Sequence, residues 1–173
     1  MSRILLVTGV PGVGKTTLVR RVVDRLEGVR VAGFTTEEIR EGGRRLGFRI
    51  CPLAGPERTM AHVDLPGPER VGRYRVDVAA IEAVAATAVV LDPTVGLYVV
   101  DEIGRMECLS ERFVAQMRAL LDSDRCVFAT IARKGGGFVA EVKRRGDVEL
   151  WEVTVRNRDV LCERILAWVR GEQ

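Results

Sequence analysis

Aromatic residues are scarce in this sequence, where they make up 5% of the 173 residues. Proteins that bind single-stranded nucleic acids stack bases on aromatic side chains set in a basic groove. No basic cluster of this sequence is interleaved with aromatics in that way. The net charge of +3 is mild, and it suits phosphate-bearing substrates as well as nucleic acids. A nucleic-acid partner is therefore only weakly supported.

The sequence also lacks paired cysteines, a signal peptide and any long apolar run. No C-x-x-C pair suggests zinc binding or redox chemistry, and reduced thiols are typical of the cytoplasm. A predicted phosphate-binding loop follows the first strand directly, which leaves no room for a signal peptide. No apolar run reaches the roughly 18 residues needed to span a bilayer. We therefore expect a cytoplasmic protein with no membrane partner. The four cysteines are Cys51, Cys108, Cys126 and Cys162.

Internal repeats and low-complexity linkers are absent too, so no domain boundary is marked. A chain of 173 residues with 47% hydrophobic content can bury a substantial core. We therefore expect residues 1–173 to form a single domain. The sequence carries no signal for an oligomeric state, and a monomer is the simpler expectation.

The most informative stretch of the chain is residues 9–17. It fits the pattern G-x-x-x-x-G-K-[ST] of the phosphate-binding P-loop, which is trustworthy only between a strand and a helix. The flanks agree, because residues 4–7 form a short apolar run and residues 18–26 carry apolar side chains at helical spacing. Glycines let backbone N–H groups surround a phosphate at the start of a helix. The predicted ligand residues are Gly9, Val10, Pro11, Gly12, Val13, Gly14, Lys15, Thr16 and Thr17.

Three side chains of this loop have predicted roles. Lys15 would bridge the β- and γ-phosphates of a nucleoside triphosphate. The Thr16 hydroxyl would fill one position around Mg²⁺, and Thr17 would add a contact to the α-phosphate. The sequence thus predicts a nucleoside triphosphate as substrate and Mg²⁺ as cofactor.

A second informative stretch is the apolar run 97–100, which ends in two carboxylates. Burial of this strand would carry Asp101 to the carboxyl edge of the sheet, beside the P-loop. Asp101 would hold Mg²⁺, and Glu102 would orient or deprotonate an attacking water. Glu107 follows five residues later. Two interpretations of Glu107 stay open: a second catalytic carboxylate, or a glutamate of a surface loop.

Several basic or polar residues could contact the nucleotide from other loops. Arg44 and Arg45 lie on a predicted β-hairpin, and Arg133 lies in the flexible basic loop 133–137. Asn157 and Arg158 precede the last helix, where helix capping explains Asn157 equally well. One of the four arginines is expected to neutralise charge in the transition state. For Arg133, a solvated basic turn is an alternative interpretation.

The order of predicted elements indicates an α/β fold. Strands and helices alternate along most of the chain, which favours a mostly parallel central sheet flanked by helices. A hairpin around residues 41–43 interrupts the alternation and is expected as an insertion. The predicted strands cover 4–7, 29–35, 71–76, 97–102, 125–130 and 148–153.

Several stretches together resemble a known family, the small P-loop nucleoside-triphosphatases represented by thermophile NTPases and a human cancer-related NTPase. The most distinctive match is 101–107, with the sequence Asp-Glu-Ile-Gly-Arg-Met-Glu. The resemblance implies a RecA-like P-loop fold, slow hydrolysis of several nucleoside triphosphates with Mg²⁺, and broad tolerance of the base. The other matching stretches are 9–17, 33–37, 43–48 and 71–77, together with Thr154, Asn157 and Arg158.

We therefore expect Mg²⁺-dependent hydrolysis of ATP, GTP and other nucleoside triphosphates to diphosphate and phosphate. Two alternatives stay open. A P-loop kinase would instead phosphorylate a nucleoside, nucleotide or polynucleotide, and would need a pocket for that acceptor. An NTP-dependent switch would act through a nucleic-acid or protein partner, and its hydrolysis would respond to that partner.

Overall fold

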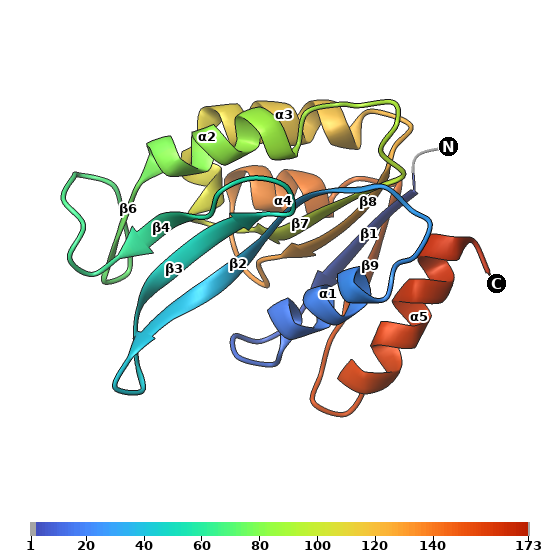
Figure 1. The fold of residues 1–173 in the computed structure, drawn as a ribbon, viewed down its shortest axis with the longest axis horizontal. Coiled ribbons are helices and arrows are strands. Elements are labelled where there is room, and N and C mark those ends of the chain that lie inside the picture. The colour runs from blue at the N-terminus through green and yellow to red at the C-terminus, as the bar shows by residue number, and fades with distance from the viewer. Residues whose placement is uncertain (1–2, 173) are drawn as a thin grey trace.

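The computed structural model describes residues 3–172, and its centre is a nine-stranded sheet with helices on both faces (Figure 1). The strand order is β5-β6-β4-β3-β2-β7-β8-β1-β9. The strands are β1 (Arg3–Thr8), β2 (Val31–Glu41), β3 (Arg44–Pro52), β4 (Arg58–His62), β5 (Arg70–Val71), β6 (Tyr74–Val76), β7 (Leu97–Ile103), β8 (Cys126–Ile131) and β9 (Val148–Glu152).

The sheet is mixed, so the prediction of a mostly parallel sheet is wrong. Strands β2, β7, β8, β1 and β9 pair in parallel, whereas β3, β4, β6 and β5 extend the sheet through antiparallel pairs. The cause lies in residues 31–76, where no helix separates consecutive strands. Connections this short can join only antiparallel neighbours, since a parallel crossover needs a dozen residues or more.

The predicted hairpin is confirmed, and its strands belong to the main sheet. Strands β2 and β3 are joined by Gly42 and Gly43, whose φ values of 55° and 76° suit a tight hairpin turn. The predicted strand 71–76 is instead two short strands, β5 and β6. Gly72, with a φ of 59°, turns the chain between them.

Helices cover both faces of the sheet. Figure 1 places α2 and α3 over one face and α1 and α5 over the other. Within residues 3–172, no helix combines the length and the apolar character that crossing a membrane requires. The helices are α1 (Lys15–Asp24), α2 (Val78–Ala88), α3 (Glu111–Leu121), α4 (Gly137–Lys143), α5 (Arg158–Arg170) and a 3₁₀ turn, η1 (Glu107–Leu109).

Strand β1 is buried on both faces and so fixes the position of the loop that follows it. Ile4 and Leu6 belong to the core under α2 and α3, whereas Leu5 and Val7 belong to the core under α1 and α5. This alternation follows from the two-residue period of a strand. Burial on both faces is typical of parallel strands, and it holds the end of β1 rigidly at the sheet edge.

Gly33 allows strand β2 to approach strand β7 closely. Its φ is 120°, and a Cβ atom built on it would lie 1.8 Å from the carbonyl oxygen of Val99. Any other residue would therefore push the two strands apart. The close approach matters for the site, because Thr36 of β2 hydrogen-bonds Asp101 of β7.

Candidate functional site

The candidate site lies where three neighbouring parallel strands end. Strand β8 pairs with β1 on one side and with β7 on the other. The carboxyl ends of β1, β8 and β7 therefore meet at one edge, which is where open α/β sheets bind ligands. The loop 9–14 follows β1, Thr130 lies near the end of β8, and Asp101 and Glu102 lie near the end of β7.

The loop after β1 turns directly into helix α1. Gly12 and Gly14 have φ values of 79° and 103°, a region that favours glycine. The Lys15 amino group lies 3.3 Å from the carbonyl oxygen of Gly9 and 3.1 Å from Oε2 of Glu102, and it donates a hydrogen bond to each. Lys15 thus connects the loop with the carboxylates of β7.

Asp101 is a buried carboxylate surrounded by hydroxyl groups. Its Oδ1 accepts a hydrogen bond from Thr130 at 2.7 Å, and its Oδ2 accepts one from Thr36 at 3.4 Å. Burial raises the pKa of Asp101, against hydrogen bonds from Thr130 and Thr16 that lower it. No Lys, Arg or His side chain within residues 3–172 forms an ion pair with it. Buried charges are usually paired with a cation or a metal ion.

Glu102 is adjacent to Asp101 in sequence, yet both side chains border the same cavity. Successive residues of a regular strand point to opposite faces of a sheet. Strand β7 departs from this pattern, because its register with β8 shifts between Val100 and Ile103. Such irregularities commonly redirect side chains next to active sites.

Glu107 is buried beside Glu102, which excludes the surface-loop interpretation. Its exposed fraction is 4%. A Cβ atom on Gly104 would lie 2.8 Å from Oε1 of Glu102 and 2.9 Å from Oε2 of Glu107, so any other residue would displace the two carboxyl groups from their present positions. Burial and the nearby charge of Glu102 raise the pKa of Glu107 to about 8. Glu107 is therefore protonated at neutral pH.

The raised pKa of Glu107 predicts a specific effect on stability. The pKa in the unfolded chain is the ordinary 4.5, so between pH 4.5 and 8 the folded state holds a proton that the unfolded state has lost. The free energy of unfolding falls as pH rises through this window, by up to about 1.4 kcal/mol per pH unit from this group. Glu107→Gln removes this contribution, so wild type should lose more stability than the variant between pH 6 and pH 8.

Urea denaturation of both proteins at pH 6 and pH 8 measures the effect. Glu41→Gln, at an exposed position on the β2–β3 hairpin, is the control and should follow the wild type. Equal pH dependence in wild type and Glu107→Gln would contradict the assignment.

Two cavities meet at Lys15 and Thr16. The first, of about 340 Å³, also borders Asp101, Glu102 and Glu107. Its remaining lining residues are Pro11, Gly12, Thr36, Glu38, Arg45, Phe48, Met60, Val71, Arg105, Met106 and Ala132. The second, of about 420 Å³, runs along the loop and the start of α1 toward strand β2. A triphosphate lying along the loop would thus have open space at both ends.

The predicted arginines are not equally placed. Arg45 borders the first cavity, where its guanidinium donates to the Tyr74 hydroxyl at 2.9 Å and to Oε1 of Glu38 at 3.1 Å. Arg44 is exposed at the turn of the same hairpin, and Arg133 is exposed in the loop before α4. Neither of these two borders the cavities at Lys15.

The two candidates before α5 also differ from each other. Arg158 reaches the glycine-rich loop after β1, with its guanidinium 3.4 Å from the carbonyl oxygen of Val13. The Asn157 side chain accepts from the Thr154 amide at 2.7 Å and donates to the Glu152 carbonyl at 2.8 Å. Asn157 therefore holds its own loop together, and it makes no side-chain cap of α5.

Sequence analysis missed three residues of the site. Thr36 and Thr130 donate hydrogen bonds to Asp101. The sequence feature that could have indicated them is a threonine near the end of a predicted strand. Burial lowers the pKa of Lys143, and the positive charge of Lys15 lowers it further. The Lys143 amino group donates a hydrogen bond to the Arg133 carbonyl oxygen at 2.8 Å, and only the fold brings it near enough to Lys15 for the two charges to interact.

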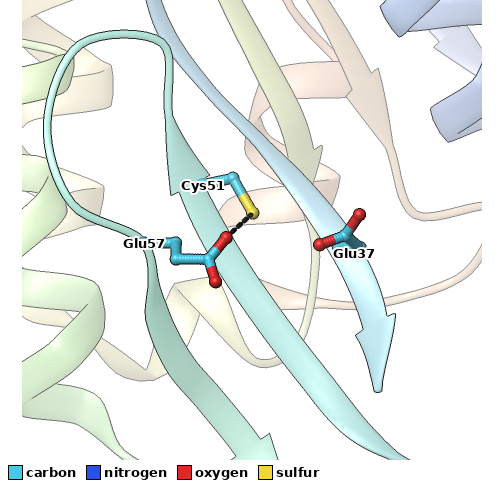
Figure 2. Close-up of side chains that lie close together, drawn as sticks. All are labelled: Glu37, Cys51 and Glu57. Atoms are coloured by element: carbon cyan, nitrogen blue, oxygen red, sulfur yellow. Dashed lines mark hydrogen bonds between the residues drawn. The ribbon is translucent and has the colours of Figure 1, made fainter. Parts of the chain in front are cut away.

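A separate cluster lies on the antiparallel side of the molecule. Figure 2 shows Glu37, Cys51 and Glu57, whose potential ligand atoms lie within 4.8 Å of one another. Both carboxylates are already neutralised, since Arg49 lies 3.7 Å from each and Arg20 lies 3.3 Å from Glu37. Burial and the two carboxylates raise the pKa of the Cys51 thiol. The cluster is therefore a network of ion pairs around a protonated thiol.

The fold and the site define an α/β protein that can hold an anionic ligand between the glycine-rich loop after β1 and the carboxylates at the end of β7. Comparison with known proteins supplies the family. A family model described as NTPase matches residues 4–166. Nucleoside-triphosphatase THEP1 of Thermotoga maritima is 40% identical, with 98% of each chain covered. The human cancer-related nucleoside-triphosphatase is 36% identical over the full length of both chains.

A solved structure agrees with this assignment. The crystal structure of THEP1 from Aquifex aeolicus has a TM-score of 0.86 and 35% sequence identity, and the match covers 98% of this chain and 99% of that one. This chain therefore belongs to the NTPase family, as the resemblance in its sequence predicted.

Proposed function

We propose that this protein hydrolyses nucleoside triphosphates to diphosphate and phosphate, with Mg²⁺ as its cofactor and with broad tolerance of the base. The observation that carries the proposal is the convergence of Lys15, Asp101 and Glu102 on one cavity. Family membership supports it, because the relatives are named nucleoside-triphosphatases.

The finer assignment of the fold, to the RecA-like P-loop class, is part of the same proposal. Its support is the strand–loop–helix unit in which α1 begins at Lys15 directly after Gly14. A single domain and a cytoplasmic location also belong to it. All strands within residues 3–172 lie in one sheet, and the four cysteines are free thiols, as is usual in the cytoplasm.

The loop amides and Lys15 would bind the phosphates. Successive N–H groups at the start of α1 form a concave anion site, which the helix dipole reinforces. In this structure the Lys15 amino group donates a hydrogen bond to Glu102. We expect it to bind the β- and γ-phosphates instead when the substrate arrives. That exchange would release the carboxylate of Glu102 for chemistry.

The residues around Asp101 fit Mg²⁺, because this ion prefers oxygen ligands. Thr16 and Asp101 would hold it, and Thr130 and Thr36 would keep the carboxylate of Asp101 oriented. When bound, Mg²⁺ neutralises charge on the β- and γ-phosphates. Asp101 would then lose the upward shift of its pKa, because a cation beside the carboxylate favours its ionised form.

Glu102 is the proposed base that positions the attacking water and accepts its proton. Glu107, neutral near pH 7, adds no second negative charge beside it. Among the four candidate arginines, Arg45 borders the cavity of Glu102 and Arg158 contacts the loop. Either guanidinium could neutralise transition-state charge, and positioning with electrostatics would supply most of the catalysis.

Phosphate release across a panel of nucleotides tests the proposal. ATP, GTP, CTP and UTP should be hydrolysed at comparable rates in the presence of Mg²⁺, because no base-specific contact is needed for the loop to hold a triphosphate. Removal of Mg²⁺ with EDTA should stop the reaction, and nucleoside diphosphates should release no phosphate. Absence of phosphate release from every triphosphate would end the proposal, and strong stimulation by RNA or DNA at low salt would favour the switch.

A further inference from the structure

The cavity next to Glu102 is larger and more apolar than hydrolysis requires. A water molecule occupies about 30 Å³ in the liquid, whereas this cavity measures about 340 Å³. Part of that space would hold the γ-phosphate near Lys15 and Thr16. The remainder borders the antiparallel strands, where apolar side chains lie together with the charged pair of Glu38 and Arg45.

The apolar side chains of this region, which we term the distal wall, are Phe48, Met60, Val71, Met106 and Ala132. Five different elements or loops contribute to it, since these residues come from β3, β4, β5 and the segments that follow β7 and β8. Met60 is buried, with an exposed fraction of 2%. Phe48 packs edge-on against Tyr74, with ring centroids 5.3 Å apart, so the wall is held in place from behind.

Ligand pockets are typically concave and apolar, with a few polar groups that orient the ligand. The cavity has this composition, because it combines the apolar distal wall with a few charged groups, among them the carboxyl groups of Glu102 and Glu107. A carboxylate base that borders the same cavity as an apolar wall can accept a proton from an alcohol as well as from water.

We propose that the cavity binds an acceptor alcohol with an apolar body, and that the protein transfers the γ-phosphate to its hydroxyl group. The inference rests on the proposed function, because the same loop and carboxylates must hold the triphosphate. The hydroxyl oxygen attacks the γ-phosphorus and forms a new O–P bond. The bond between the γ-phosphorus and the β–γ bridging oxygen breaks, its electron pair leaves with the diphosphate, and Glu102 takes the hydroxyl proton.

Partitioning of the γ-phosphate between alcohol and water tests this proposal. The protein is incubated with ATP and Mg²⁺ in equal concentrations of benzyl alcohol or methanol, and benzyl phosphate, methyl phosphate and inorganic phosphate are quantified by ³¹P NMR. Binding of the ring should raise the ratio of ester to inorganic phosphate at least about tenfold for benzyl alcohol over methanol, equivalent to about 1.4 kcal/mol.

Variants locate the effect in the cavity. Val71 is half-buried on the short strand β5 and does not belong to the catalytic carboxylates or the loop. Val71→Trp should fill the distal end and bring the benzyl-to-methyl preference close to one. Val71→Phe provides a milder version should the tryptophan variant fold poorly, as judged by circular dichroism. Val160→Trp, at a position on α5 with 61% exposure, is the matched control and should keep the preference.

The possible results separate this inference from hydrolysis. Continued release of inorganic phosphate with equal, or no, formation of the two esters would overturn the acceptor site and leave the hydrolase standing. A preference that survives in Val71→Trp and Val71→Phe would also overturn it. Failure to consume ATP under any condition would remove the proposed function itself.

Discussion

Lys15→Ala should abolish measurable hydrolysis and strongly weaken binding of nucleoside triphosphates. The Lys15 amino group is the cation that connects the loop with Glu102, and no other lysine or arginine within residues 3–172 forms an ion pair with Glu102. Loss of one electrostatic contact to a transition state typically costs 10²- to 10³-fold in turnover. We expect a reduction of kcat/KM of about 10³-fold or more, since Lys15 also supports binding of the substrate.

Calorimetric titration with a non-hydrolysable ATP analogue and an assay of phosphate release measure the two effects. Lys134→Ala is a suitable control, because it removes the same charge from an exposed position in the loop before α4. Binding of the analogue by Lys15→Ala with wild-type affinity would show that the loop does not hold the phosphates as proposed.

Glu102→Gln should retain binding and lose turnover by roughly 10²-fold or more, the scale of losing a general base. Glutamine keeps the shape of the side chain but cannot accept a proton. The Lys15–Glu102 ion pair is also lost, and Lys15 no longer has to leave a charged partner when the phosphates arrive. Binding of the triphosphate should therefore be unchanged or tighter, even though turnover falls.

Single-turnover kinetics separate binding from the chemical step in this variant. Glu111→Gln, at an exposed position at the start of α3, should behave like the wild type. Normal turnover by Glu102→Gln would transfer the role of base to Glu107, and Glu107→Gln would then be the inactive variant.

Much of the local structure could be predicted from sequence. The caps are an example: Asp77 accepts a hydrogen bond from the Ala80 amide at 3.1 Å, and Ser110 accepts one from the Phe113 amide at 3.0 Å. Both residues stand directly before a helix, and both are of the types that favour this position. Caps, tight turns and apolar periodicity depend on residues a few positions apart, so the sequence displays them directly.

The environment of the carboxylates could not be predicted in the same way. Glu107 had two open interpretations because nothing nearby in sequence indicates burial beside Glu102. Its raised pKa comes from desolvation and from a neighbouring charge, and both depend on how η1 packs under the sheet edge. The difference between Arg44 and Arg45 has a similar origin, since adjacent residues of a strand point to opposite faces.

By itself, the sequence determined the family, the glycine-rich loop, the apolar strand ending in Asp101 and Glu102, and most strands. Only the tertiary structure decided the mixed order of the sheet, the hydroxyl groups around Asp101, the burial of Glu107 and the cavity beside Glu102. The physical reason is the range of the interactions involved. Local elements rest on hydrogen bonds and packing between near neighbours, whereas the site is assembled from strand ends that lie together only after the whole sheet has formed.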